Sequence, residues 1–186
     1  MLTWGGGYRH SRDRVKNAAE FGFLPGDVDL HWANLFAQNE YAVTPDLKLT
    51  AGAKVEHNKY TGAEYLPSLR LAWTPAPGQL VWSSLARTVR APSRFDRDLH
   101  APSRPLVVGG RTVYFYGGGP NFQSEVAKVV ELGYRAQPLP TLSYSATAFY
   151  SRYDRLRTLE PQTSPTAPAL FEFENRAEGD TRGVEL

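Results

Sequence analysis

The residues best suited to binding chemistry lie in one polar segment, residues 91–121, which is rich in arginine, proline and glycine. Arginine suits the recognition of carboxylates and phosphates, because its planar guanidinium donates two hydrogen bonds at once. Aromatic side chains beside it would add flat contact surfaces. The alternative is a charged, solvent-exposed loop without a ligand. The residues that we predict to contact a ligand are Arg94, Arg97, Arg104, Arg111, Tyr114 and Tyr116.

The spacing of the polar residues does not indicate a catalytic site or a metal site. The four histidines, His10, His31, His57 and His100, are scattered, and the chain has no cysteine, so no ligand pair has the spacing of a zinc site. The glycine-rich residues 117–120 lack the following Lys and Ser or Thr of a phosphate-binding loop. We therefore expect no catalytic residues, no metal site and no cofactor.

The elements that must position the arginine-rich segment are β-strands. Between residues 47 and 57, apolar and polar side chains alternate almost without exception, and the pattern returns in residues 68–74 and 141–151. A period of two is typical of a strand with one apolar face. Such strands form either the wall of a membrane barrel or a soluble antiparallel sheet that covers its own core.

The lengths of the connections favour the membrane barrel. No run approaches the roughly 20 apolar residues of a transmembrane helix, so only strands could cross a bilayer. Long connections at residues 11–31, 58–65, 91–121 and 160–169 alternate with short ones, as in barrels with short turns on one side of the membrane. We predict an all-β fold, an antiparallel up-and-down transmembrane β-barrel, of which the chain forms about nine strands. The expected strands are residues 2–10, 32–43, 47–57, 66–74, 80–90, 122–136, 141–158, 170–177 and 182–186.

In a barrel, the two faces of the sheet would have different surroundings. Polar side chains would line the lumen, and aromatic side chains would form girdles at the two bilayer interfaces. A solvated sheet face and ordinary sheet packing are the alternatives. The predicted lumen-facing residues are Lys48, Lys54, Glu56, Arg70, Glu131 and Arg135. The predicted girdle residues are Trp73, Trp82, Tyr134, Tyr144 and Tyr150.

The composition excludes some classes of protein. Among 186 residues, Lys and Arg number 21 and Asp and Glu number 19, a net charge of +2 that argues against a dedicated nucleic-acid binder. Hydrophobic residues make up 41% and charged residues 22%, as in chains that fold.

Several stretches, taken in order, resemble the C-terminal part of the barrel of the TonB-dependent outer-membrane receptors. The most specific are Arg87-Thr-Val-Arg-Ala-Pro92, Pro120-Asn-Phe-Gln-Ser-Glu125, Glu131-Leu-Gly-Tyr-Arg135, and Asn175 with Gly183-Val-Glu-Leu186. The resemblance implies a barrel of about 22 strands plugged by a separate domain. It also implies a location in the bacterial outer membrane and uptake of a scarce ligand, such as an iron-siderophore complex or cobalamin. Implied partners are the plug domain, the TonB complex, outer-membrane lipid and lipopolysaccharide.

The chain lacks a recognisable plug domain, TonB box and terminal aromatic strand. We therefore expect residues 1–186 to be a fragment of a receptor's barrel domain. One alternative is a soluble all-β binding domain that recognises an anionic or glycan partner through residues 91–121. A passive channel is a third hypothesis.

Overall fold

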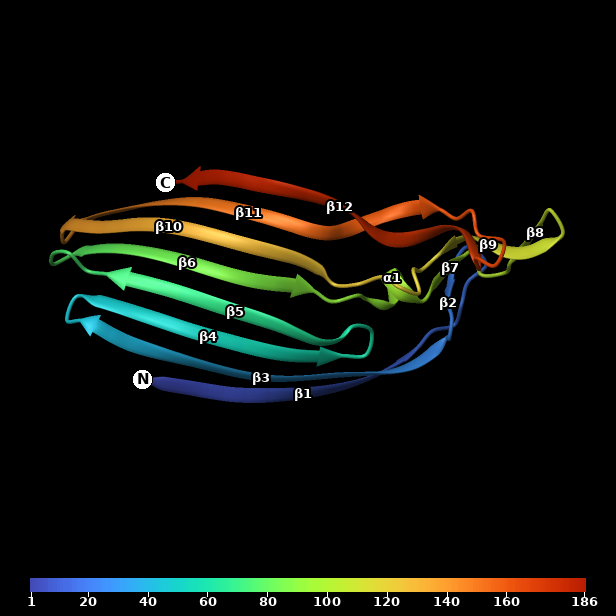
Figure 1. The fold of residues 1–186 in the computed structure, drawn as a ribbon, viewed down its shortest axis with the longest axis horizontal. Helices are drawn as coiled ribbons and strands as arrows, with labels where there is room; N and C mark the ends of the chain where they lie inside the picture. The colour runs from blue at the N-terminus through green and yellow to red at the C-terminus, as the bar shows by residue number, and fades with distance from the viewer.

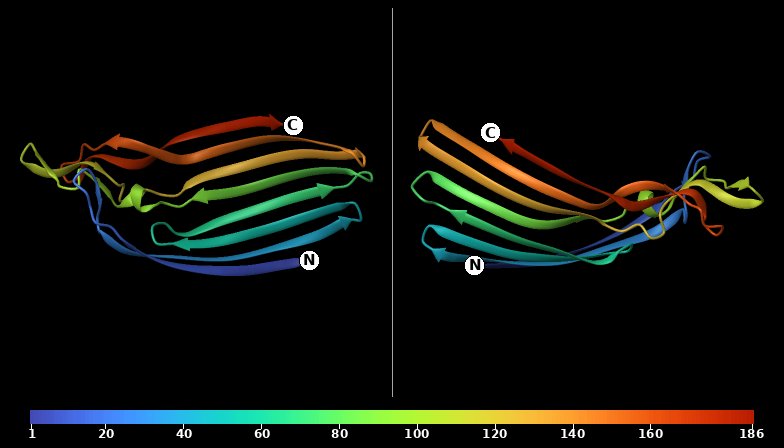
Figure 2. Two further views of the ribbon diagram at one scale, coloured as in Figure 1. Left: turned by 180° about the vertical axis from the view of Figure 1, so that it is seen from behind. Right: turned by 45° about the horizontal axis from the view of Figure 1, so that its top comes forward.

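The computed structural model describes residues 1–186. They form one curved sheet whose long strands lie side by side (Figures 1 and 2). Each long strand pairs antiparallel with its neighbour in the chain, in the order β1-β3-β4-β5-β6-β10-β11-β12. The predicted all-β, up-and-down architecture is therefore confirmed. The eight long strands are β1 (Leu2–Arg14), β3 (Asp27–Thr44), β4 (Leu47–Asn58), β5 (Gly62–Trp73), β6 (Gln79–Arg90), β10 (Glu125–Leu139), β11 (Leu142–Pro161) and β12 (Ala169–Glu185).

Strand β12 replaces two strands of the sequence-based prediction. The predicted turn at residues 178–181 is wrong, because Gly179 and Asp180 stay in register with Tyr153 and Arg152 of β11. The pairing of β11 with β12 becomes irregular only beyond Tyr153, between Tyr153 and Leu156 and between Leu156 and Thr158. The sheet consequently has eight long strands instead of about nine.

The connections differ in length between the two ends of the sheet. Residues 45–46, 74–78 and 140–141 make the turns at one end, and residues 15–26, 59–61, 91–124 and 162–168 join strands at the other. The predicted long connection at residues 58–65 is wrong. The Asn58 carboxamide oxygen accepts hydrogen bonds from the amides of Tyr60 and Thr61, both at 2.9 Å, and closes a tight turn.

Four short strands and one helical turn fill the long-loop end. They are β2 (Gly22–Phe23), α1 (Arg94–Arg97), β7 (Leu99–Ala101), β8 (Leu106–Val108) and β9 (Arg111–Gly117). Strand β9 adds to β12, β7 adds to β9, and β2, from the connection between β1 and β3, adds to β7. The loops thereby join the two sides of the sheet at this end (Figure 1). No helix of the structure is long and apolar enough to cross a membrane.

The strand register gives the sheet one polar and one apolar face. Arg70 lies opposite Thr50 and Ser84, and the Ser84 hydroxyl donates a 2.7 Å hydrogen bond to Glu131. The apolar face carries exposed Leu69, Leu85 and Val130 in one cross-strand row. All six residues predicted to face the lumen share the polar face, namely Lys48, Lys54, Glu56, Arg70, Glu131 and Arg135. That this face lines a lumen stays a prediction.

Four of the five predicted girdle aromatics lie on the apolar face: Trp73, Tyr134, Tyr144 and Tyr150. Trp82 lies on the polar face, so its prediction is wrong. It is opposite Gly133, where a Cβ atom would lie 2.2 Å from the indole. The missing side chain lets the ring lie flat against the neighbouring strand. The same arrangement joins Phe36 to Gly5 and Phe149 to Gly183.

Candidate ligand-binding site at the long-loop end

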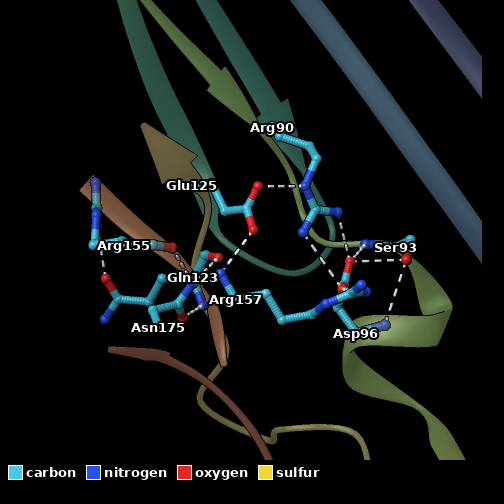
Figure 3. Close-up of polar contacts among 8 residues, drawn as sticks. All are labelled: Arg90, Ser93, Asp96, Gln123, Glu125, Arg155, Arg157 and Asn175. Atoms are coloured by element: carbon cyan, nitrogen blue, oxygen red, sulfur yellow. Dashed lines mark hydrogen bonds and ion pairs between the residues drawn. The ribbon is translucent and has the colours of Figure 1, made fainter. Parts of the chain in front are cut away.

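A buried carboxylate, Asp96, organises the base of the long connection between β6 and β10 (Figure 3). Its side chain is 0% exposed and accepts hydrogen bonds from Arg90 at 2.9 Å and Arg157 at 3.1 Å. The backbone amide and hydroxyl of Ser93 donate to the same carboxylate at 2.9 and 2.8 Å. Ser93 and Asp96 thereby form a capping box that starts α1.

The charge of Asp96 is retained despite its burial. Desolvation by itself would raise the pKa of Asp96, but the hydrogen bonds from Arg90 and Ser93 outweigh it and leave the pKa below its usual value. Arg90 also donates to Glu125 at 2.7 Å, and Glu125 accepts from the backbone amide of Arg157 at 2.9 Å. The network joins α1 to the ends of β6, β10 and β11, so it holds the long connection on three strands.

A second set of hydrogen bonds joins Gln123, at the end of residues 119–123, to Arg155 of β11 and Asn175 of β12 (Figure 3). The Asn175 carboxamide accepts from the amide of Gln123 at 2.6 Å and donates to the carbonyls of Gln123 at 3.1 Å and Arg155 at 2.7 Å. Arg155 donates to the Gln123 side chain at 2.7 Å. It has a φ of 61° and lies in the β11 bulge, a backbone conformation that the surrounding contacts must stabilise.

Asn175→Ala is expected to loosen residues 119–123 without unfolding the sheet. Three hydrogen bonds are lost, each worth about 0.5–1.5 kcal/mol, so the local opening free energy falls by roughly 2 kcal/mol. The measurement is hydrogen exchange at the Gln123 amide. Asn39→Ala, which removes an exposed carboxamide without a hydrogen-bonded partner, is the matched control. Equal exchange at Gln123 in the two variants would contradict the assignment.

Two of the predicted ligand-contacting arginines serve the fold instead. The buried Arg94 guanidinium donates to Asp13 at 2.8 Å, to Asp98 at 3.1 Å and to two backbone carbonyls, and it stacks on Phe23. The prediction for Arg94 is corrected, because these contacts leave it no face for a ligand. Arg97 donates to the Phe122 carbonyl at 2.7 Å, and burial lowers the pKa of Arg97.

The other predicted residues lie farther out along the loops. Arg111 donates to the Ala167 carbonyl at 3.1 Å and so joins β9 to the connection before β12. Tyr114 packs edge-on against His100, with ring centroids 4.4 Å apart. Arg104 is exposed and makes no hydrogen bond or ion pair. The structure therefore does not bring all six residues into one cluster.

Tyr116 belongs to an exposed aromatic cluster that the sequence only partly indicated. Its ring is 4.7 Å from that of Phe115 and 5.8 Å from that of Phe171, and Phe115 lies 5.5 Å from Phe171. Phe115 is 37% and Tyr116 40% exposed, so both rings offer surface to a ligand. Phe171 was missed because it lies in a different strand, β12, that pairs parallel with β9.

A cavity of about 430 Å³ lies between residues 119–123 and the neighbouring part of β12. Glu172 lines it, is only 7% exposed, and has a buried Oε1 atom without a hydrogen-bonded partner. An unpaired buried carboxyl oxygen is costly, so a hydrogen-bond donor that reached this atom would stabilise the site. Other polar residues that line the cavity are Arg155, Gln162, Glu174 and Arg176. The chain has no group of three or more His, Cys, Asp or Glu residues that could hold a metal ion.

A curved antiparallel wall with one apolar face, one polar face and its longer loops at one end is typical of an outer-membrane β-barrel protein. The TonB dependent receptor-like, beta-barrel family matches residues 2–186, and the chain belongs to this family of the bacterial outer membrane.

Relatives agree with this assignment. The chain is 26% identical over 153 residues to an iron-regulated outer membrane virulence protein of Vibrio cholerae, which covers 82% of this chain and 22% of the relative. The fold of the chain described here is similar to that of the ferric enterobactin receptor of Pseudomonas aeruginosa, with a TM-score of 0.72 and 20% identity. The similarity covers 98% of this chain and 29% of the receptor. The fold is also similar to that of the siderophore receptor PirA of Pseudomonas aeruginosa, with a TM-score of 0.75 and 17% identity. The similarity covers 98% of this chain and 35% of PirA. The chain thus spans about a fifth of the curated relative and about a third of the solved receptors.

Proposed function

We propose that residues 1–186 form part of the barrel domain of a TonB-dependent receptor that takes up a scarce ligand such as an iron-siderophore complex. The proposal draws support from an iron-regulated relative and from folds shared with two siderophore receptors. The observation that carries it is the long-loop end, where ion pairs with the buried Asp96 fasten the base of the connection that carries the exposed Phe115 and Tyr116. No feature of the chain favours the soluble domain or the passive channel.

The first contact with the ligand is assigned to Arg104, Phe115 and Tyr116. Iron complexes of carboxylate or catecholate chelators are bulky anions, which a guanidinium binds by charge and aromatic rings bind by stacking. Arg111 and Tyr114 support this surface from β9. The cavity beside Glu172 accepts a donor group of the same ligand.

The proposal extends to the remaining partners of the receptor. The polar face with Lys48, Arg70 and Glu131 packs against the plug domain, and the TonB complex supplies the energy for uptake. The apolar face contacts outer-membrane lipid, and the exposed loops meet lipopolysaccharide.

Deletion of the gene that encodes this chain is expected to abolish uptake of at least one ferric siderophore. The measurement is cell-associated 55Fe after addition of iron-loaded catecholate, hydroxamate and carboxylate siderophores under iron limitation, with radiolabelled cobalamin as a separate probe. Restoring the gene on a plasmid is the control. Unchanged uptake of every probe, or recovery of the chain in the soluble fraction, would overturn the proposal.

The double substitution Phe115→Ala with Tyr116→Ala is expected to weaken siderophore binding by the cells about tenfold, because each stacked ring contributes roughly 0.5–1.5 kcal/mol. The measurement is the concentration of ferric siderophore that gives half-maximal binding at 4 °C, where uptake stops. Tyr41→Ala, which removes an exposed ring near the short-turn end, is the matched control. Equal binding by both variants would exclude the aromatic cluster as the ligand contact.

A further inference from the structure

Glu172 is a buried carboxyl group whose charge no neighbouring side chain balances. The residue is 7% exposed, and its Oε1 atom has no hydrogen-bonded partner. It lies near the start of β12, at the long-loop end of the sheet (Figure 1). Strands β11 and β12 continue here past the start of β10, because Glu125, the first residue of β10, accepts a hydrogen bond from the amide of Arg157. Glu172 therefore lies among the loops, outside the part of the wall that crosses the membrane.

The glycine-rich residues 117–120 bury this carboxyl group. Gly117 is the register partner of Glu172 in the parallel pairing of β9 with β12, and a Cβ atom at Gly117 would lie 2.8 Å from the Ala169 side chain. A Cβ atom at Gly119 would overlap a backbone carbonyl of β12. Only glycine lets a backbone approach a strand so closely. The glycine-rich motif thus closes over the carboxyl group.

Two other carboxylates lie beside Glu172. Glu160 of β11 is directly opposite it, and Glu174 follows two residues later on the same face of β12. Like charges in these positions destabilise a sheet. Burial and, less strongly, the charge of Glu174 raise the pKa of Glu172, and they outweigh a backbone hydrogen bond at Ala169 that opposes them. Glu172 therefore keeps its proton at pH values at which an exposed glutamate is ionised.

The nearby basic side chains have other partners. Arg176 pairs with Glu174 at 2.6 Å. Arg155 lines the same cavity as Glu172 but donates to a glutamine side chain at 2.7 Å. His100 of β7 lies across β9 from Glu172, and its ring is hydrogen-bonded to a backbone carbonyl at 2.9 Å. Since none of them forms an ion pair with Glu172, only a proton removes its charge.

We propose that Glu172 is a pH-sensitive positioning residue that holds β9 against β12 while its carboxyl group is protonated. Strand β9 carries Phe115 and Tyr116, so the same contact positions the exposed aromatic cluster. Deprotonation places an uncompensated charge beneath residues 117–120. Water can reach that charge only when these residues move away from β12. The effect on ligand capture rests on the proposed function, whereas the attachment of β9 does not.

The protection of amides in residues 111–119 is expected to fall as the pH rises. Because the pKa of Glu172 is raised in the folded chain, its contribution to stability is fully present below the unfolded value of about 4.3. The contribution is lost as the pH rises through the raised value. The measurement is hydrogen exchange of the full chain in nonionic detergent micelles, relative to the intrinsic exchange rate at each pH. We expect protection to fall about tenfold or more between pH 4.5 and pH 8.

Glu172→Gln is expected to remove this pH dependence, because the amide is neutral and has nearly the shape of the protonated carboxyl group. Glu178→Gln is the matched control. Glu178 lies on the same strand with a side chain that is 70% exposed, so its substitution is expected to leave the native profile unchanged. A flat profile in the native chain, or the native profile in Glu172→Gln, would overturn the proposal.

A second variant leaves the buried side chain in place. Glu174→Gln removes the neighbouring like charge and is expected to move the loss of protection to lower pH. A loss at higher pH, or at the native pH, would contradict the assigned role of Glu172. Because the exchange measurement contains no siderophore, it succeeds or fails independently of the uptake function.

Discussion

Asp96→Asn is expected to free the base of the connection between β6 and β10 while the long strands stay paired. The substitution removes the charge that Arg90 and Arg157 share, and it leaves two partly exposed guanidinium groups facing each other. Loss of charged hydrogen bonds to a buried carboxylate costs about 2–3 kcal/mol, less than for a fully buried pair because both arginines reach solvent. The measurement is limited proteolysis and hydrogen exchange within residues 91–124.

Asp27→Asn is the matched control, because Asp27 is an exposed aspartate at the same end of the sheet and makes no ion pair. It is expected to change neither proteolysis nor exchange in residues 91–124. If Asp96→Asn behaved like this control, the buried carboxylate would not be what fastens the loop.

The same carboxylate predicts an acid dependence. Since the pKa of Asp96 is lowered in the folded chain, its contribution to stability is fully present above the unfolded value of about 3.9. It is lost as the pH falls through the lower, folded pKa. The protection of amides within residues 91–124, measured relative to the intrinsic exchange rate at each pH, is therefore expected to fall as the pH drops below about 3.9 in the native chain. The Asp96→Asn variant is expected to lack this component of the acid dependence, and an identical profile would contradict the assignment.

Gly133→Val is expected to displace the Trp82 ring from the polar face of the sheet. Even a Cβ atom at residue 133 would lie 2.2 Å from the indole, and valine adds two methyl groups to it. Overpacking of this kind costs about 1–3 kcal/mol. The measurements are the near-ultraviolet circular dichroism of the tryptophans and the midpoint of thermal unfolding in detergent.

Two further variants separate this clash from a general effect of valine in a strand. Ala51→Val enlarges an exposed residue on the apolar face and is expected to be nearly neutral. Combining Gly133→Val with Trp82→Ala removes the obstructing ring, so the two substitutions are expected to be non-additive. Additive effects would show that the ring and the glycine do not interact.

The period-two pattern of the sequence was sufficient to predict the faces of the sheet, because alternation in a strand is fixed by backbone geometry. It placed Lys54, Arg70 and Glu131 on one face correctly. The same parity assigns Trp82 to the face of Ser84, but the expectation that tryptophan lies at a membrane interface overrode it. For Trp82, the position in the alternating pattern predicted the face of the sheet better than the residue type did.

The site was harder to predict because its contacts link distant segments. The spacing of Ser93 and Asp96 is that of a capping box, so the start of α1 was detectable in the sequence. Nothing local indicates that Asp96 meets Arg157, 61 residues later, or that Asn175 holds Gln123. Those pairs depend on the bulges of β11 and β12, which no pattern in the sequence revealed.

The aromatic rings that lie over glycines have a consequence for how the strands align. Trp82 has room only opposite Gly133, since a slip of two residues would place it opposite Glu131 or Arg135. Phe149 is matched to Gly183 in the same way, with Thr181 and Glu185 as the neighbouring alternatives. Each ring therefore selects one stagger between its two strands. The stagger between neighbouring strands sets their tilt in a barrel. By selecting one stagger, these ring and glycine pairs therefore help to fix the strand tilt and the curvature of the wall as the sheet assembles.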